Sequence, residues 1–120
     1  MLINELFTQM KNENFVGEIE LNENRIMWKL SESTIIEVYL DDDEPEGIIF
    51  VNYTKKSLST HWHPTTDEMF KELMEINSGN KFGAVKIKGF FFRNHLFIMD
   101  KDIWNSLSDR KKKQYEILGF

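Results

Sequence analysis

Two histidines stand two residues apart in the stretch STHWHPTTDE, near the middle of the chain. His61 and His63 alternate along a predicted strand, so their side chains share one face, about 6.6 Å apart along the chain. Two imidazoles at this spacing can bind one divalent metal ion, but a zinc site needs at least a third protein ligand. The third ligand could be His95, Asp67 or Glu68, and the spacing does not select among them. The pair therefore supports one hypothesis, a metal-binding protein or metal-dependent enzyme that uses His61 and His63.

The run His61-x-His63-x4-Glu68 resembles part of the first metal-binding motif of cupins, small β-barrel proteins. The resemblance implies a metal held by two histidines and the following glutamate. It covers eight residues, and the glycines that flank the motif in cupins would fall near Lys55 and Met74. No second motif with a further histidine follows it.

Glu68 also has a structural interpretation. Thr65 and Glu68 form the T-x-x-E capping box, and Asp67 adds a negative charge to the first turn of the helix that this box predicts. The apolar stripe of that helix consists of Met69, Phe70, Leu73 and Ile76, and its stop signal is Ser78-Gly79-Asn80. We therefore expect Glu68 to serve the helix cap, and the histidines to lie on the wetter face of a strand.

The densest charge in the chain is an acidic run. It consists of Asp41, Asp42, Asp43, Glu44 and Glu46, with Pro45 before the last of them. The run lacks the alternating ligands and central glycine of an EF-hand loop, so calcium binding is not predicted. One interpretation is a solvated loop between two strands. The other is a contact loop for a basic protein, because clustered charge raises the rate of association more than the affinity.

Hydrophobic periodicity predicts a single α+β domain over residues 1–120. Apolar residues recur at helical spacing from Leu2 to Met10, and the period then changes to two from Val16 to His63. The expected fold is an antiparallel β-meander sheet of five to seven strands. An N-terminal helix, a helix after the meander, a second hairpin and a C-terminal helix complete it. The C-terminal helix is expected to begin at Asp100 or Asp102 and to restart at Ser108.

Both faces of the predicted sheet carry apolar residues. Trp62 alternates with Leu58 and Thr60 and is predicted to lie in the core. The apolar residues predicted on the opposite face are Met27, Ile35, Tyr39, Ile48 and Phe50. A terminal helix is the favoured cover for that face, and a dimer partner or a target protein is the alternative.

Composition narrows the function classes. The chain of 120 residues contains no cysteine, which excludes disulfides and thiolate chemistry and fits a reducing cytoplasm. Its net charge of −5 argues against nucleic-acid binding, and no stretch predicts membrane insertion. The sequence contains no recognisable pairing of a nucleophile with a base, no phosphate-binding glycine loop and no cofactor motif. We therefore expect no cofactor, and either a monomer or a homodimer.

The leading hypothesis is a non-catalytic, cytoplasmic protein-binding domain with a basic partner. Small size, acidic charge and the Lys- and Asn-rich, Ala-poor composition of AT-rich bacterial genomes favour an immunity or antitoxin type of protein. That class neutralises toxins, which are often basic nucleases. The hypothesis rests on analogy in size and charge, because no diagnostic motif is present.

Overall fold

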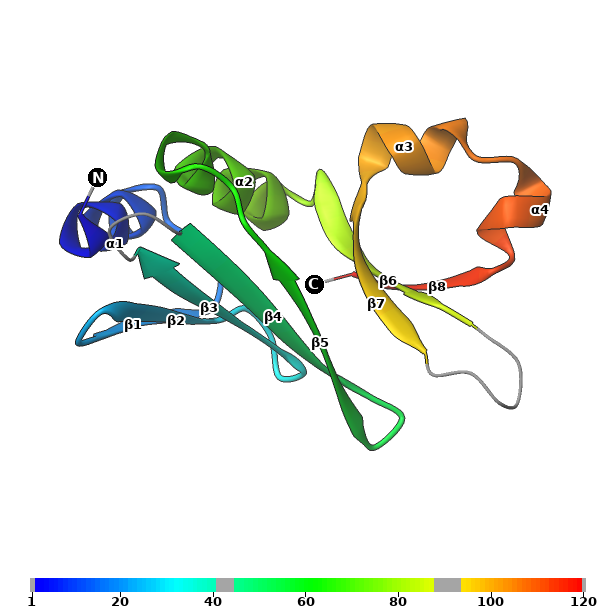
Figure 1. Ribbon diagram of the computed structural model, residues 1–120, viewed down its shortest axis with the longest axis horizontal. Coiled ribbons are helices and arrows are strands. Elements are labelled where there is room, and N and C mark those ends of the chain that lie inside the picture. Colours follow the sequence, from blue (N-terminus) through cyan, green and yellow to red (C-terminus); the bar gives the residue numbers. More distant parts are fainter. Residues whose placement is uncertain (1, 41–44, 88–93, 120) are drawn as a thin grey trace.

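The chain folds into a five-stranded antiparallel sheet with two helices on one face, followed by a smaller three-stranded sheet (Figure 1). The computed structural model describes residues 2–40, 45–87 and 94–119. In chain order the elements are α1 (Ile3–Asn12), β1 (Glu18–Asn22), β2 (Arg25–Lys29), β3 (Thr34–Leu40), β4 (Pro45–Tyr53), β5 (Lys56–Trp62), α2 (Thr66–Ser78), β6 (Lys81–Lys86), β7 (His95–Asp100), α3 (Lys101–Ser106), α4 (Asp109–Lys112) and β8 (Tyr115–Gly119). The predicted α+β fold is confirmed.

The five-stranded sheet is the predicted meander, in the order β1-β2-β3-β4-β5. Short turns connect consecutive strands and make them antiparallel neighbours. In each strand one set of alternate residues faces the core, as the burial pattern of β4 shows most clearly. Leu58, Thr60 and Trp62 are the half-buried residues of β5, so the prediction that Trp62 packs against the core is confirmed.

The core lies between the sheet and the helices α1 and α2. Leu6 and Met10 of α1 and Leu73 of α2 are fully buried against sheet residues such as Trp28 and Ile36. Both helices therefore owe their position to an apolar stripe at helical spacing. Thr65 caps α2 as predicted, because its Oγ1 accepts a hydrogen bond from the backbone N–H of Glu68 at 3.2 Å.

The second sheet has the order β7-β6-β8 and shares the core of the first. Val85 and Leu96 face that core, and β5 lies against β7. A hydrogen bond of 2.5 Å from the hydroxyl of Tyr53 in β4 to Glu116 Oε2 in β8 also joins the two sheets. This bond raises the pKa of Tyr53 above its ordinary value.

The end of the chain differs from the prediction of a C-terminal helix. Two short helices, α3 and α4, are followed by the strand β8. Tyr115 and Ile117 alternate with Glu116, a period of two that suits a strand, and β8 pairs with β6 on the side that β7 leaves free. The predicted start at Asp100 and restart at Ser108 are confirmed, because these residues cap α3 and α4. The prediction is wrong for the last stretch, which was expected to continue as a helix and forms β8 instead.

The expected helical cover of the second sheet face is also wrong for the residues that the structure describes. We call this face the outer face and define it by Met27, Ile35, Tyr39, Ile48 and Phe50. The helix α1 packs on the opposite, core-facing side, with α2. The helix α3 packs beside the second sheet, where Trp104 contacts Phe82 and Tyr115. Neither α1 nor α3 therefore covers the outer face.

Gly47 gives a testable prediction for the packing of Trp62. Gly47 pairs with Trp62 across β4 and β5, and a methyl group on Gly47 would overlap the indole ring. We expect Gly47→Ala to lower the free energy of unfolding by about 2 kcal/mol, because the ring must move out of its site. Urea denaturation measures the loss. In a Trp62→Ala background the same substitution should cost little, and an equal loss in both backgrounds would contradict this packing.

Candidate functional site

Acidic side chains gather at one end of the five-stranded sheet. The register pairs Asn22 with Arg25 and Leu40 with Pro45, which places the β1–β2 turn and the β3–β4 connection at the same end. The junction from β5 to α2 lies there too, because Trp62 pairs with Gly47 near the start of β4. We call this region the acidic end. Its described carboxylates are Glu23, Glu46, Asp67 and Glu68.

The other predicted contact residues belong to the same connection. Asp41, Asp42, Asp43 and Glu44 lie outside the described residues, and they link Leu40 of β3 to Pro45 of β4. Glu46 is described and lies in β4. The β3–β4 connection thus adds four carboxylates in sequence to the four that the structure describes at this end.

Glu46 and His61 are brought together across neighbouring strands. Glu46 Oε1 lies 2.5 Å from His61 Nδ1, and the side chain of His61 is about half exposed, at 53%. The carboxylate accepts this hydrogen bond from the ring N–H. Sequence reasoning did not predict this pair, because it depends on the register between β4 and β5.

His63 does not continue the strand that carries His61. The strand β5 ends at Trp62, so the alternation that placed the two histidines on one face ends there as well. In the parts of the chain that the structure describes, no group of three His, Asp or Glu residues could hold a metal ion. The metal hypothesis remains a prediction about His61 and His63.

Glu68, the third residue of the cupin-like run, belongs to a helix. It lies in the first turn of α2, where its carboxylate accepts a hydrogen bond of 2.8 Å from the hydroxyl of Thr65. The chain after His63 therefore enters a helix, whereas the cupin motif continues in β structure. This local geometry supports the capping interpretation of Glu68.

The outer face beside the acidic end is apolar, with one carboxylate at its centre. Glu37 lies between Met27 and Ile48 in the register of β2, β3 and β4. It is largely shielded from solvent, accepts a hydrogen bond of 2.9 Å from the Tyr39 hydroxyl, and lies 3.4 Å from Arg25. Paired in this way, Glu37 does not stop the outer face from burying apolar surface in a complex.

Charge is divided between the two parts of the chain, a feature that the sequence prediction missed. Residues 1–80 contain sixteen acidic and six basic residues, a net charge of −10. Residues 81–120 contain four acidic and nine basic residues, a net charge of +5. The whole-chain value of −5 hides this division, which separate counts for the two parts would have revealed. Such a division of charge gives the chain an uneven electrostatic field.

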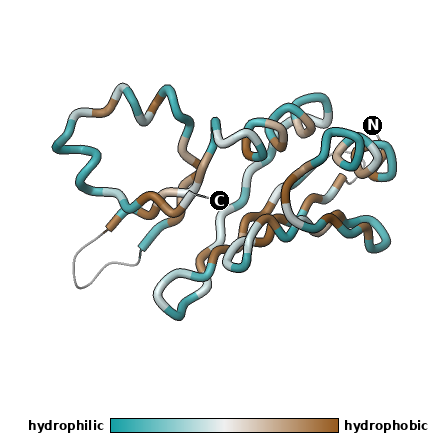
Figure 2. The backbone as a smooth tube through the Cα atoms, turned by 180° about the vertical axis from the view of Figure 1, so that it is seen from behind, coloured by the Kyte–Doolittle hydropathy of each residue, from teal (hydrophilic) through white to brown (hydrophobic). Residues whose placement is uncertain are grey.

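The basic part carries a second apolar surface, on the three-stranded sheet. Its rings contact one another in the order Phe82, Trp104, Tyr115, Phe97 and His95, with centroids 6.1 to 6.5 Å apart. Apolar segments of both sheets and polar segments of the arch formed by α3 and α4 are visible from behind (Figure 2). The ammonium group of Lys112 lies 5.6 Å from the Trp104 ring centroid. This face therefore combines aromatic rings with positive charge.

A cavity of about 510 Å³ adjoins these rings and is lined by Phe82, Trp104 and Ile117 as well as by Lys81. Lys81 forms ion pairs with Glu72 and with Glu75. Burial lowers the pKa of Lys81, but the two carboxylates outweigh it and hold the pKa above its ordinary value. The charge of Lys81 is thus already neutralised within the fold.

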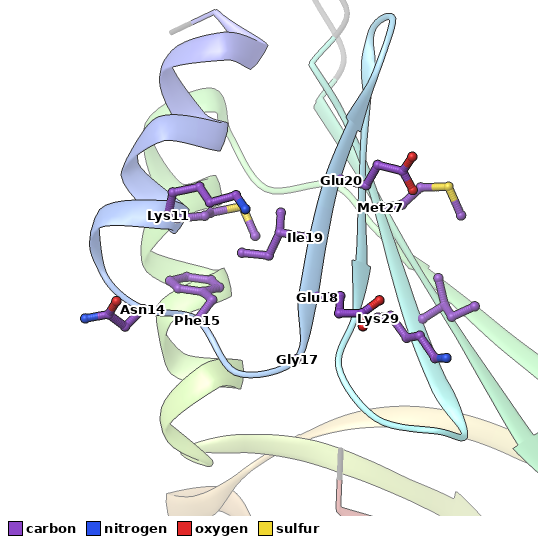
Figure 3. A pocket seen from close by; sticks show the side chains of 11 residues that line it. Lys11, Asn14, Phe15, Gly17, Glu18, Ile19, Glu20, Met27 and Lys29 are labelled. Atoms are coloured by element: carbon purple, nitrogen blue, oxygen red, sulfur yellow. The ribbon is translucent and has the colours of Figure 1, made fainter.

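A larger groove, of about 710 Å³, follows the free edge of β1 (Figure 3). On one side of the strand it is lined by Lys11, Asn14 and Phe15, from α1 and the connection after it. On the other side its lining includes Glu20 and Met27 on the outer-face side of the sheet. The groove therefore spans both faces of the sheet at its edge.

Comparison of the chain with protein-family models, with curated proteins and with solved structures found no match. Within the described ranges, no helix is long and apolar enough to cross a membrane.

Proposed function

We propose that this protein is a non-catalytic protein-binding domain that uses the acidic end and the adjoining outer face to bind a basic protein. The observation that carries the proposal is that carboxylates from a turn, a strand and a helix lie at the same end of the sheet. Glu23 lies in the β1–β2 turn, Glu46 near the start of β4 and Asp67 in the first turn of α2. Glu46 also accepts a hydrogen bond from His61, and Asp67 adds negative charge to the first turn of α2, so these carboxylates can serve the fold as well as a partner.

The acidic end and the outer face would affect different steps of binding, namely association and dissociation. The acidic end attracts a basic partner over about 8 to 10 Å of solution at physiological salt and so raises the association rate. The outer face supplies apolar area, whose burial slows dissociation. Net charges of opposite sign in the two parts of the chain turn the acidic end toward such a partner. An acidic end next to an open apolar face thus favours a protein over a small ion.

An immunity or antitoxin role is the specific form of this proposal. A chain of this size and charge would block a basic toxin by covering its nucleic-acid-binding surface with carboxylates. Co-expression with a toxin encoded by a neighbouring gene would test that role directly. Growth of the cells only in the presence of this protein would support immunity, and unchanged killing would contradict it.

Neutralisation of the acidic end should weaken capture of the partner without unfolding the protein. We expect Asp41→Asn/Asp43→Asn to retain about one tenth as much basic partner as the wild type at low salt, because the Coulombic attraction is reduced. We expect thermal stability to change little, because reducing the repulsion among the charges of an acidic run does not remove apolar packing. Immobilised wild-type and variant proteins, incubated with lysate of the source cell, provide the comparison by quantitative mass spectrometry.

A matched control variant separates local charge from net charge. Glu13→Gln/Glu32→Gln removes the same two charges at the opposite end of the sheet, where both side chains are exposed. It should capture as much partner as the wild type. Equal capture by all three proteins would contradict the proposed role of the acidic end.

A further inference from the structure

The strand β1 is a free edge of the five-stranded sheet. Among the described residues it pairs with β2 alone, whereas the other edge strand, β5, lies against β7. Free edges present unpaired backbone groups to which another strand can add. The groove of about 710 Å³ runs along this edge, with α1 on one side and the outer face on the other (Figure 3). A strand added beside β1 could therefore place its alternate side chains against protein surface on both faces of the sheet.

The hairpin between β1 and β2 determines which backbone groups point to the open edge. Its two-residue turn, Glu23-Asn24, is closed by the pair Asn22 and Arg25. Such a closing pair is hydrogen-bonded, and hydrogen-bonded pairs alternate with non-bonded pairs along an antiparallel ladder. The backbone N–H and C=O groups of Ile19 and Leu21 consequently point away from β2. They offer two donors and two acceptors to an added strand.

We propose that β1 binds an extended segment of the basic partner as a sixth strand of the sheet. The inference rests on the proposed function, since it specifies how a basic protein would be held. The backbone groups of Ile19 and Leu21 supply the hydrogen bonds of this added strand. Its alternate side chains would lie on the two sides of the groove, and the residues on each side determine whether a basic or an apolar side chain fits there.

The chemistry of the added strand follows from its neighbours on β1. On the outer side it would lie beside Glu18 and Glu20, which are both exposed. Glu18 faces Lys29 across the hairpin, but Glu20 faces Met27 and has no basic residue opposite it. On the core-facing side the added strand would lie beside Ile19 and Leu21, near Phe15. A segment in which lysine or arginine alternates with apolar residues matches both sides.

Charge argues against a second copy of the chain as the occupant. Antiparallel pairing of two β1 strands would place the carboxylates of Glu18 and Glu20 opposite those of the other copy. Like charges opposite one another destabilise a strand pair. The same carboxylates stabilise a basic strand, so the edge discriminates between the two occupants.

A synthetic peptide of seven residues that alternates lysine with isoleucine provides the probe. Hydrogen exchange measured by NMR should show at least tenfold slower exchange of the Ile19 and Leu21 amides when the peptide is bound. A peptide with the same side chains but N-methylated at every residue has no backbone N–H to donate on either edge. It should give no protection, and equal protection by both peptides would overturn the inference.

Variants of exposed glutamates test the charge requirement. Glu20→Lys should weaken peptide binding at least tenfold in fluorescence anisotropy, while Glu32→Lys, with the same change in net charge at a distant turn, should not. Equal binding of the peptide by both variants would contradict the edge site. So would a failure of the peptide, at millimolar concentration, to protect the Ile19 and Leu21 amides of the wild-type protein. Capture of a natural partner that depends on Asp41 and Asp43 but leaves the Ile19 amide unprotected would refute this inference and retain the proposed function.

Discussion

Trp28→Ala is expected to lower the free energy of unfolding by about 4 kcal/mol, the largest loss among the substitutions considered. Trp28 of β2 is fully buried in the core, and its ring packs 4.9 Å from that of Phe15 between centroids. Its indole Nε1 also donates a hydrogen bond of 2.6 Å to the carbonyl oxygen of Val16. Alanine would leave a large cavity and an unpaired carbonyl, so urea denaturation should show a much lower midpoint.

Trp28→Phe separates the two contributions. Phenylalanine keeps an aromatic ring in the core but has no N–H to donate, so we expect a loss of about 1 to 2 kcal/mol. The smaller loss would show that the hydrogen bond to Val16 is secondary to packing. Equal losses for Trp28→Ala and Trp28→Phe would contradict this division, because they would assign the whole effect to the hydrogen bond.

Gly17→Ala should cost about 3 kcal/mol, although it adds only one methyl group. Gly17 has a φ of +78°, which favours glycine, and a methyl group there would overlap the backbone carbonyl oxygen of Lys29. That oxygen belongs to β2, so it cannot move aside without disturbing the sheet. Denaturant unfolding of the variant and the wild type measures the loss.

Gly79→Ala provides the control for backbone strain. Gly79 has a φ of +85°, similar to that of Gly17, but nothing lies within 4 Å of the position that a methyl group would occupy. Its substitution should therefore cost only the left-handed conformation, about 1 kcal/mol. If the two alanine variants lost equal stability, the close approach of Gly17 to Lys29 would not matter for folding.

The sequence was sufficient to predict elements whose order is set by local patterns. The alternation from Val16 to His63 predicted the meander, and Thr65 with Glu68 predicted the start of α2. Trp62 was assigned to the core from its alternation with Leu58 and Thr60. These predictions succeeded because a period and a cap each depend on residues that are close in the chain.

Features that depend on distant pairing could not be predicted in the same way. The contact between Glu46 and His61 requires the register of two strands, and the edge position of β1 requires the strand order. The final strand was missed because its pairing with β6 joins residues about thirty positions apart. The division of charge at residue 80 was legible in the sequence, but the whole-chain charge conceals it.

The association rate between this protein and its captured basic partner, measured as a function of salt, tests the proposed binding role most directly. For the wild type we expect the rate constant to fall at least about tenfold between low and high salt, because attraction to the acidic end is screened. The variant Asp41→Asn/Asp43→Asn should start from a slower rate and fall less. A wild-type rate that does not change with salt, or that the variant reproduces at every salt concentration, would contradict recognition through the acidic end.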